Sequence, residues 1–260
     1  MLFPKGIEAR YRKYLKSIVR DIEKAYKFAI VSNKDVMWSG NPGERFDTAE
    51  DIERALFRLQ EMINGVVQFS TAERSLDRFS QDTSTFATTQ VNRQLSIIGI
   101  SLGQSTVTQQ ILTQWVSQNT DLIKSIGDDV RKQIATIVRD GFSRGLRWES
   151  VAKSINGTSL SPGVFKKARN RAQLIARDQV ASLNGNITKT QMQRGGVNAY
   201  IWRDSDDARV RQKHANLDGK IFSWGDKSVV DGVTYHQAPG GIIPGSEINC
   251  RCVAEAYFGN

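Results

Sequence analysis

The sequence predicts an α+β protein, with a mainly α-helical N-terminal body followed by a small C-terminal α+β unit of short strands. Through most of the first 196 residues, apolar side chains recur at three- and four-residue steps, which is the helical period. At Val197 the pattern changes to strand-like alternation, and nine of the 21 glycines lie after position 194. We therefore expect three regions: a helical N-terminal region that could serve as an assembly arm, 1–118; a second helical region, 119–196; and a small α+β core, 197–260.

Two helices are expected before residue 66. The first spans 7–29, and a loop around Asn41-Pro42-Gly43 follows it. The second helix is expected to start near Thr48, whose hydroxyl can cap the free amides of the first turn. Its apolar stripe consists of Ile52, Leu56, Leu59 and Ile63.

Residues 66–118 are rich in Ser, Thr and Gln and carry few charges after Asp82. Two interpretations remain open for this segment. One is a surface that contacts other subunits or an extended helical arm, and the other is an ordinary buried helical hairpin.

Three further helices are expected between residues 119 and 196. The first covers about 119–138, and a short one follows at 148–155. The third is expected to use Ser161 as its cap and Pro162 as its first helical residue, where a missing N–H is harmless. Gly195-Gly196 should end that helix, because glycine readily adopts the left-handed conformation found after helices.

The chain has a formal net charge of +9, and the positive charge is concentrated in residues 1–30 and 161–200. Such segments bind nucleic acid or an acidic protein surface, or they are simply solvated helix faces. Our candidate nucleic-acid-binding residues are Lys166, Lys167, Arg169 and Arg171. We expect no membrane association, since no apolar run approaches the ~18 residues that a membrane span requires.

Both histidines and both cysteines of the protein, His214, His236, Cys250 and Cys252, lie in the last fifth of the chain. Four nitrogen and sulfur ligands are what a tetrahedral zinc site uses, so zinc is the expected cofactor. The alternating pattern of 249–257 predicts a strand with both cysteines on one face, and the backbone would have to bend at Arg251 to bring both sulfurs to one metal. The alternative is a pair of buried cysteines facing the core, with the histidines hydrogen-bonded nearby.

A catalytic interpretation is also open, because a histidine near carboxylates can act as a general base. The spacing specifies no reaction, and neither a Walker-type phosphate loop nor a Gly-x-Ser-x-Gly nucleophile motif is present. The residues concerned are Asp204, Asp206, Asp207, Arg209, Arg211 and His214.

An ordered series of motifs resembles the phage head morphogenesis family, the Mu F-like minor head proteins of tailed bacteriophages. The resemblance covers roughly 119–258 and is most specific in its last fifty residues; the first 118 residues match nothing that we can name. The series consists of Asp207-Ala208-Arg209-Val210-Arg211, His214, Leu217-Asp218-Gly219-Lys220, Pro244-Gly245 and Ile248-Asn249-Cys250-Arg251-Cys252, and is preceded by Arg171–Gln179 and Leu183-Asn184-Gly185.

The resemblance implies a non-enzymatic minor component of the virion, made in the host cytoplasm and located in the phage head near the portal vertex. It implies roles in head assembly and in genome packaging, retention or delivery. The implied partners are the portal protein, the major capsid or scaffolding protein and packaged double-stranded DNA. The alternatives are a metal-dependent nuclease or toxin-like enzyme, and a nucleic-acid-binding protein without a virion role.

The resemblance also implies three metal ligands, which fall on His214, Cys250 and Cys252. We expect His236 to be the fourth ligand, with Asp207 or Asp218 as substitutes.

Overall fold

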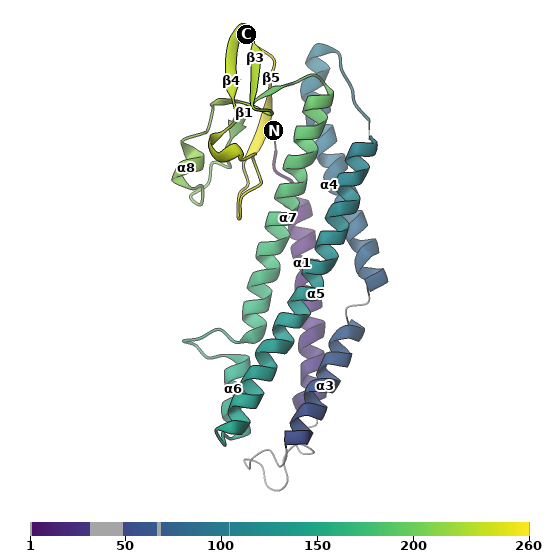
Figure 1. The fold of residues 1–260 in the computed structure, drawn as a ribbon, viewed down its shortest axis with the longest axis vertical. Coiled ribbons are helices and arrows are strands. Elements are labelled where there is room, and N and C mark those ends of the chain that lie inside the picture. Colours follow the sequence, from purple (N-terminus) through teal and green to yellow (C-terminus); the bar gives the residue numbers. More distant parts are fainter. Residues whose placement is uncertain (1, 32–48, 67–68, 104, 260) are drawn as a thin grey trace. The chain divides into compact units, whose positions relative to one another are not determined.

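The structure is a computed structural model that describes residues 2–31, 49–66, 69–103 and 105–259 (Figure 1). It confirms an α+β protein, with helices before residue 195 and short antiparallel strands after it. The helical part contains α1 (Lys5–Tyr26), the π-helical turn η1 (Lys27–Val31), α3 (Ala49–Val66), α4 (Phe69–Leu95), the 3-10 turn η2 (Ser96–Ile98), α5 (Thr106–Ser143), α6 (Trp148–Asn156) and α7 (Val164–Arg194). None of these described helices is both long enough and apolar enough to cross a membrane.

The chain divides into two compact units, each built from separated segments. Unit 1 contains Met1–Tyr11, Glu73–Asn119 and Leu174–Asn260, and unit 2 contains Arg12–Ala72 and Thr120–Gln173. The continuous helix α5 runs through the predicted boundary at 118/119, whereas the boundary at 196/197 follows the end of α7. The division into three regions stays a prediction.

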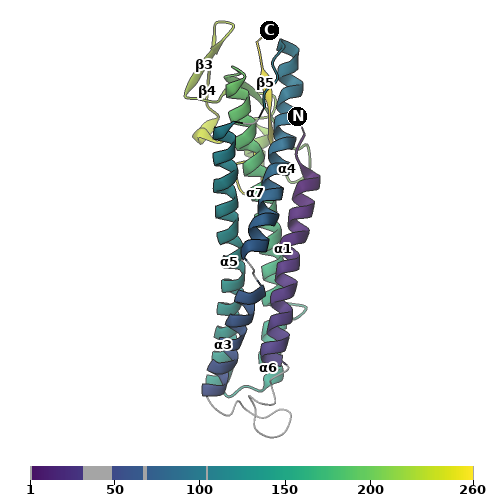
Figure 2. The same ribbon diagram turned by 90° about the vertical axis from the view of Figure 1, so that its right-hand side faces the viewer.

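Unit 2 is helical, and its core is made by the apolar stripes that the sequence predicts. Leu59 and Ile63 of α3 are buried, as are Val130 and Ile134 of α5. The helices α3 and α5 of this unit are labelled in Figure 2. Beside this core, they are joined by an ion pair in which Arg139 donates to both carboxylate oxygens of Glu53 at 2.7 Å. The predicted loop around Asn41-Pro42-Gly43 and the cap at Thr48 lie outside the described residues.

The described residues of the polar segment between 69 and 118 form helix α4, the turn η2 and the first part of α5. Several of its Ser and Thr side chains are buried, and they satisfy their hydroxyls locally: Ser80 donates to the carbonyl of Asp77, and Thr83 donates to that of Phe79. Asn92 closes the connection by bonding both the N–H and the carbonyl of Leu102. The described residues are helical with a partly buried polar face, and both interpretations of the segment stay predictions.

The start of α7 differs from the sequence prediction. The helix begins at Val164, two residues after Pro162, so Pro162 is not its first residue. Residues 157–162 instead form a tight turn, in which Gly157 pairs with Pro162 and the Thr158 hydroxyl accepts the N–H of Ser161. These local bonds hold Ser161 and Pro162 outside the helix. The other end is as predicted, since Gly196 has a positive φ of 77° and the Val197 N–H reaches the carbonyl of Met192.

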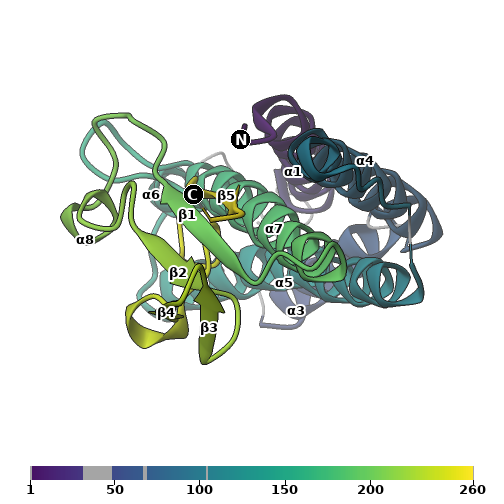
Figure 3. The ribbon, with the colours of Figure 1, turned by 90° about the horizontal axis from the view of Figure 1, so that it is seen from above.

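Unit 1 contains all the strands. The order in the main sheet is β2 (Ile221–Ser223), β1 (Ala199–Arg203), β5 (Val253–Tyr257), with antiparallel pairing throughout (Figure 3). A separate hairpin is formed by β3 (Lys227–Val230) and β4 (Val233–His236), and its turn uses two residues with positive φ, Asp231 and Gly232. Short segments, α8 (Gln212–Ala215) and η3 (Pro239–Gly241), complete the region.

The core of the C-terminal region is aromatic and is shared with two helices of unit 1. Tyr200 stacks on Trp224 with ring centroids 4.0 Å apart, and Trp202 is fully buried. Leu95 of α4 and Met192 of α7 belong to the same buried cluster. Cys250 and Cys252 border this cluster, which fixes one side of the site described next.

Candidate metal centre

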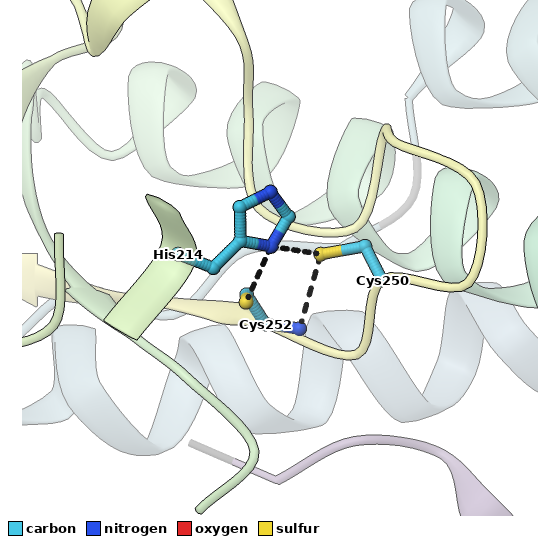
Figure 4. A group of neighbouring side chains, drawn as sticks. All are labelled: His214, Cys250 and Cys252. Atoms are coloured by element: carbon cyan, nitrogen blue, oxygen red, sulfur yellow. Dashed lines mark hydrogen bonds between the residues drawn. The ribbon is translucent and has the colours of Figure 1, made fainter. Parts of the chain in front are cut away.

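The structure brings together three side chains with metal-binding atoms, His214, Cys250 and Cys252 (Figure 4). The His214 Nδ1 atom lies 3.6 Å from the sulfur of Cys250 and 3.5 Å from that of Cys252. All three ligand atoms lie within 4.8 Å of one another, and all three residues are buried. Thirty-five residues separate His214 from Cys250, so only the folded chain makes this cluster.

The two cysteines lie in a turn before β5 and not within the strand, which corrects the sequence prediction. Asn249 adopts a positive φ of 61°, and the Cys250 N–H bonds the carbonyl of Glu247. Two residues of α7 hold this turn: Arg177 donates to the Asn249 side chain at 2.7 Å, and Asp178 accepts its backbone N–H at 2.6 Å. This turn brings both sulfurs to His214, as an extended strand could not.

A close approach between the loop before this turn and α7 requires two glycines. A Cβ atom on Gly185 of α7 would lie 2.5 Å from the carbonyl oxygen of Pro244, and one on Gly245 would lie 2.6 Å from that of Ala181. Both distances are too short for any other residue. The glycines of the two motifs Leu183-Asn184-Gly185 and Pro244-Gly245 therefore seat the cysteine turn against α7.

The two thiols of the cluster have different environments. The pKa of Cys250 is lowered because the Cys252 thiol and the Cys252 N–H, 3.4 Å from the Cys250 sulfur, both favour a thiolate there. The pKa of Cys252 is raised, because its thiol proton is shared with Cys250 and its sulfur is buried. Without a cation, the pair therefore favours one thiolate and one thiol.

Glu247 orients the histidine, and the sequence analysis did not identify it. Its Oε2 atom lies 2.7 Å from His214 Nε2, while Arg211 and Lys213 each donate to the same carboxylate at 2.6 Å. Hydrogen bonds from Lys213 and His214 lower the pKa of Glu247, so it is ionised at neutral pH. A neutral His214 that donates from Nε2 presents the lone pair of Nδ1 to the sulfurs, which is the tautomer that a metal requires.

The donor set and its spacing fit zinc. Zinc binds thiolates at about 2.3 Å and imidazole nitrogen at about 2.0–2.1 Å, so a tetrahedral ion places N and S about 3.6 Å apart. The His214–Cys250 and His214–Cys252 distances of 3.6 and 3.5 Å agree with that value. Softer N/S donors of this type select zinc over magnesium or calcium.

The other predicted ligands do not join the cluster. His236 is exposed on β4, where it pairs with Lys227 across the hairpin. Asp218 accepts the backbone N–H of Asp204 at 2.9 Å. Asp207 accepts two bonds from Arg209. Among the residues that the structure describes, the grouped metal-binding side chains are therefore His214, Cys250 and Cys252 alone.

A cavity of about 270 Å³ lies beside the cluster. Of the residues in the catalytic interpretation, Asp207, Arg209, Arg211 and His214 line it, whereas Asp204 is engaged in a local turn in which its side chain accepts the N–H of Asp206. The full lining consists of Arg177, Ser205, Asp207, Arg209, Val210, Arg211, His214, Asn249, Cys250, Arg251 and Cys252.

The four candidate nucleic-acid-binding residues lie at the start of α7, in the unit 2 part of that helix. Lys166 and Lys167 are exposed. Arg169 is engaged by Glu23 at 3.0 Å, and Arg171 contacts Asp129 and the Ser125 hydroxyl. The two lysines are therefore the stronger candidates for contacts outside the chain.

Comparison with known proteins places the cluster within a recognised family. Residues 132–255 match the family described as Phage Mu protein F like protein. An uncharacterized protein of Haemophilus influenzae (strain ATCC 51907 / DSM 11121 / KW20 / Rd) is 33% identical over 135 residues, which make up 52% of this chain and 27% of that protein. This chain thus spans little more than a quarter of the relative's length. No solved structure matches the chain. Residues 132–255, which contain His214, Cys250 and Cys252, are therefore similar to the Phage Mu F-like family.

Proposed function

We propose that this chain is a minor structural protein of a tailed-phage head, which acts in head assembly near the portal vertex and in packaging, retention or delivery of the genome. The observation that carries the proposal is the family match over residues 132–255. Its partners in this role are the portal protein and the major capsid or scaffolding protein. The net charge of +9 supports proximity to packaged double-stranded DNA, because lysine and arginine contacts to phosphates release counterions.

Zinc is the proposed cofactor, with a structural role. His214, Cys250 and Cys252 would hold the ion, and Glu247 would keep the histidine in its ligating tautomer. The bound ion would supply folding free energy, because the unfolded chain has no preformed site. The strands of this region have three to five residues each, so a metal clamp is a physically reasonable source of stability.

The test is the position of the chain in assembled particles. Phage heads and their precursors would be purified, and their protein content and a three-dimensional map of the portal vertex would be determined. We expect the chain in both kinds of particle, in contact with portal or capsid subunits. Its absence from heads and precursors would contradict the proposal. Capsids assembled from the same phage with this gene deleted provide the control for the density.

A second candidate function, metal-dependent hydrolysis, is favoured by one observation. The cluster groups three ligands beside a cavity, and catalytic zinc sites often combine three protein ligands with an open position. A metal in such a site activates a water molecule. Cleavage of DNA or RNA that is lost in His214→Ala but kept in His236→Ala would favour this function. Tight zinc binding without turnover would favour the structural one.

A further inference from the structure

The cavity beside the cluster is lined by an unusual number of guanidinium groups. Arg177 comes from α7, Arg209 and Arg211 from the segment between β1 and α8, and Arg251 from the cysteine turn. Asp207 is the only carboxylate in the lining. Four arginines from three separate segments thus converge on a space of about 270 Å³.

The carboxylates around the cavity do not balance these charges. Glu8 forms ion pairs with both Arg251, at 3.0 Å, and Arg177, at 3.8 Å. Asp207 pairs with Arg209 and lies 4.0 Å from Arg251. Glu247 forms ion pairs with both Arg211 and Lys213. These five cations face three carboxylates, a surplus of two positive charges.

Two further groups bear on this balance. Asp178 also faces Arg177 and Arg211, and burial raises its pKa, so it reduces the surplus only to the extent that it is ionised. A zinc ion bound by two thiolates and a neutral imidazole would add no net charge. With zinc bound, the cavity therefore keeps one or two positive charges, depending on the ionisation of Asp178, and without zinc the Cys250 thiolate would remove one more.

One nitrogen of the Arg177 guanidinium also lacks a hydrogen-bond acceptor, although it lies 3.8 Å from the carboxylate of Glu8. The Nε atom of Arg177 is buried and has no hydrogen-bond partner in the part of the chain that the structure describes. Leaving such a buried donor unsatisfied destabilises the folded state, and more so when the group is charged. Arg177 lines the cavity, so an anion bound there is a candidate acceptor for its guanidinium.

We propose that this cavity binds a phosphate group, either free phosphate or the terminal phosphate of a nucleotide or nucleic-acid end. A terminal phosphate carries about 1.5–2 negative charges at neutral pH, which matches the surplus. Its oxygens can accept hydrogen bonds from several arginines at once, whereas one arginine already saturates a carboxylate in a bidentate pair. The three residues of the cluster also line this cavity, so the proposed phosphate site adjoins the candidate metal centre. The proposal goes beyond the structural role given above.

Inorganic phosphate would be titrated into the full chain by calorimetry, with zinc content and melting temperature measured for every protein. Arg209→Gln removes the most exposed of the paired guanidiniums in the cavity and should leave the fold intact. Asp207→Asn removes the competing carboxylate but keeps a side-chain oxygen for the Arg209 N–H. Arg144→Gln is the matched control, since Arg144 is exposed and pairs with Asp140 in unit 2.

We expect Arg209→Gln to weaken phosphate binding roughly tenfold, Asp207→Asn to strengthen it severalfold, and Arg144→Gln to leave it unchanged. Equal affinities in all four proteins, no binding at millimolar phosphate, or tighter binding of glutamate than of phosphate would each overturn the proposal.

Competition experiments then identify the source of the phosphate. A 5′-phosphorylated oligonucleotide that competes, when its unphosphorylated twin does not, supports a nucleic-acid end. Competition by inorganic phosphate alone supports the free anion. If both oligonucleotides compete equally well, the binding is to the phosphodiester backbone, and the assignment of a terminal phosphate is wrong.

Discussion

Unit 2 and the C-terminal region 197–260 obtain their stability from different interactions. In unit 2, the side chains that are fully buried come from long helices and are aliphatic or aromatic, such as Leu59 and Ile123. In residues 197–260, each strand has at most five residues, and ion pairs and a cluster of candidate metal ligands lie next to the aromatic core. Changes to polar groups should therefore weaken the C-terminal region far more than unit 2.

The largest expected effect is loss of the metal clamp. Cys250→Ser or Cys252→Ser should abolish stoichiometric zinc and lower the free energy of unfolding by several kcal/mol, because metal-binding energy is folding energy here. Hydrogen exchange should rise in 197–260 and stay unchanged in 120–173. Zinc content, melting temperature and exchange measured by mass spectrometry would check this.

The two histidines provide the control for the same prediction. His214→Ala should behave like the cysteine variants, whereas His236→Ala should keep its zinc, because His236 is exposed outside the cluster. Loss of zinc from the His236→Ala variant would show that His236 is a zinc ligand after all. A chelator that leaves the melting curve of the unaltered protein unchanged would contradict the proposal that bound zinc stabilises the fold.

The next effect separates a buried ion pair from an exposed one. Glu8 is buried and receives bonds from Arg251 at 3.0 and 3.1 Å, so Glu8→Gln leaves cations without a counter-ion and should cost about 3 kcal/mol or more. Glu53→Gln breaks a pair of similar geometry in unit 2, but both of its partners are more than half exposed, so the cost should be below about 1 kcal/mol. Denaturant unfolding of both variants measures the difference, and equal costs would contradict it.

A smaller effect is expected from the residue that orients His214. Glu247→Gln keeps the size of the side chain but removes the charge that binds His214 Nε2, and such changes lower metal affinity about 10–100-fold. Competition with a chromophoric chelator measures this affinity. Glu255→Gln is the control, because Glu255 pairs with Arg203 and does not contact the cluster. Equal affinities in both variants would assign Glu247 to an ordinary surface ion-pair network.

The contrast between the two regions also explains what the sequence could predict. Helical periodicity indicates α1, α3 and α5, and it does so because each stripe is a local pattern. The Gly195-Gly196 stop and the strand after Val197 are local signals too. The rare residues His214, Cys250 and Cys252 could be named as candidate ligands because of their chemistry, and the structure groups these three. The same reasoning also included His236, which lies outside the group.

The parts that could not be predicted depend on contacts between distant residues. Asn249 adopts its positive φ in a turn held by Arg177 and Asp178, more than seventy residues earlier, so the pattern of 249–257 alone predicts a strand. Glu247 contacts a histidine 33 residues away, and Glu8 contacts an arginine 243 residues away. No spacing rule links such pairs. Only the folded chain identifies these carboxylates.

The smallest expected effect concerns the basic surface of unit 2. Lys166 and Lys167 are exposed, so they can bind phosphates of DNA, whereas Arg169 is engaged by Glu23. The double variant Lys166→Glu/Lys167→Glu should flatten the dependence of log affinity on log salt by about two units for duplex DNA, without changing the melting temperature. Fluorescence anisotropy over a range of salt concentrations measures this slope.

Reversal of Arg144 and Lys153, two exposed basic residues elsewhere in unit 2, should change it less, because Arg144 already pairs with Asp140. Equal slopes in the unaltered protein and in the lysine variant would assign both lysines to an ordinary solvated helix face. A lower melting temperature in Arg169→Ala with an unchanged slope would confirm that the charge of Arg169 is used within the fold.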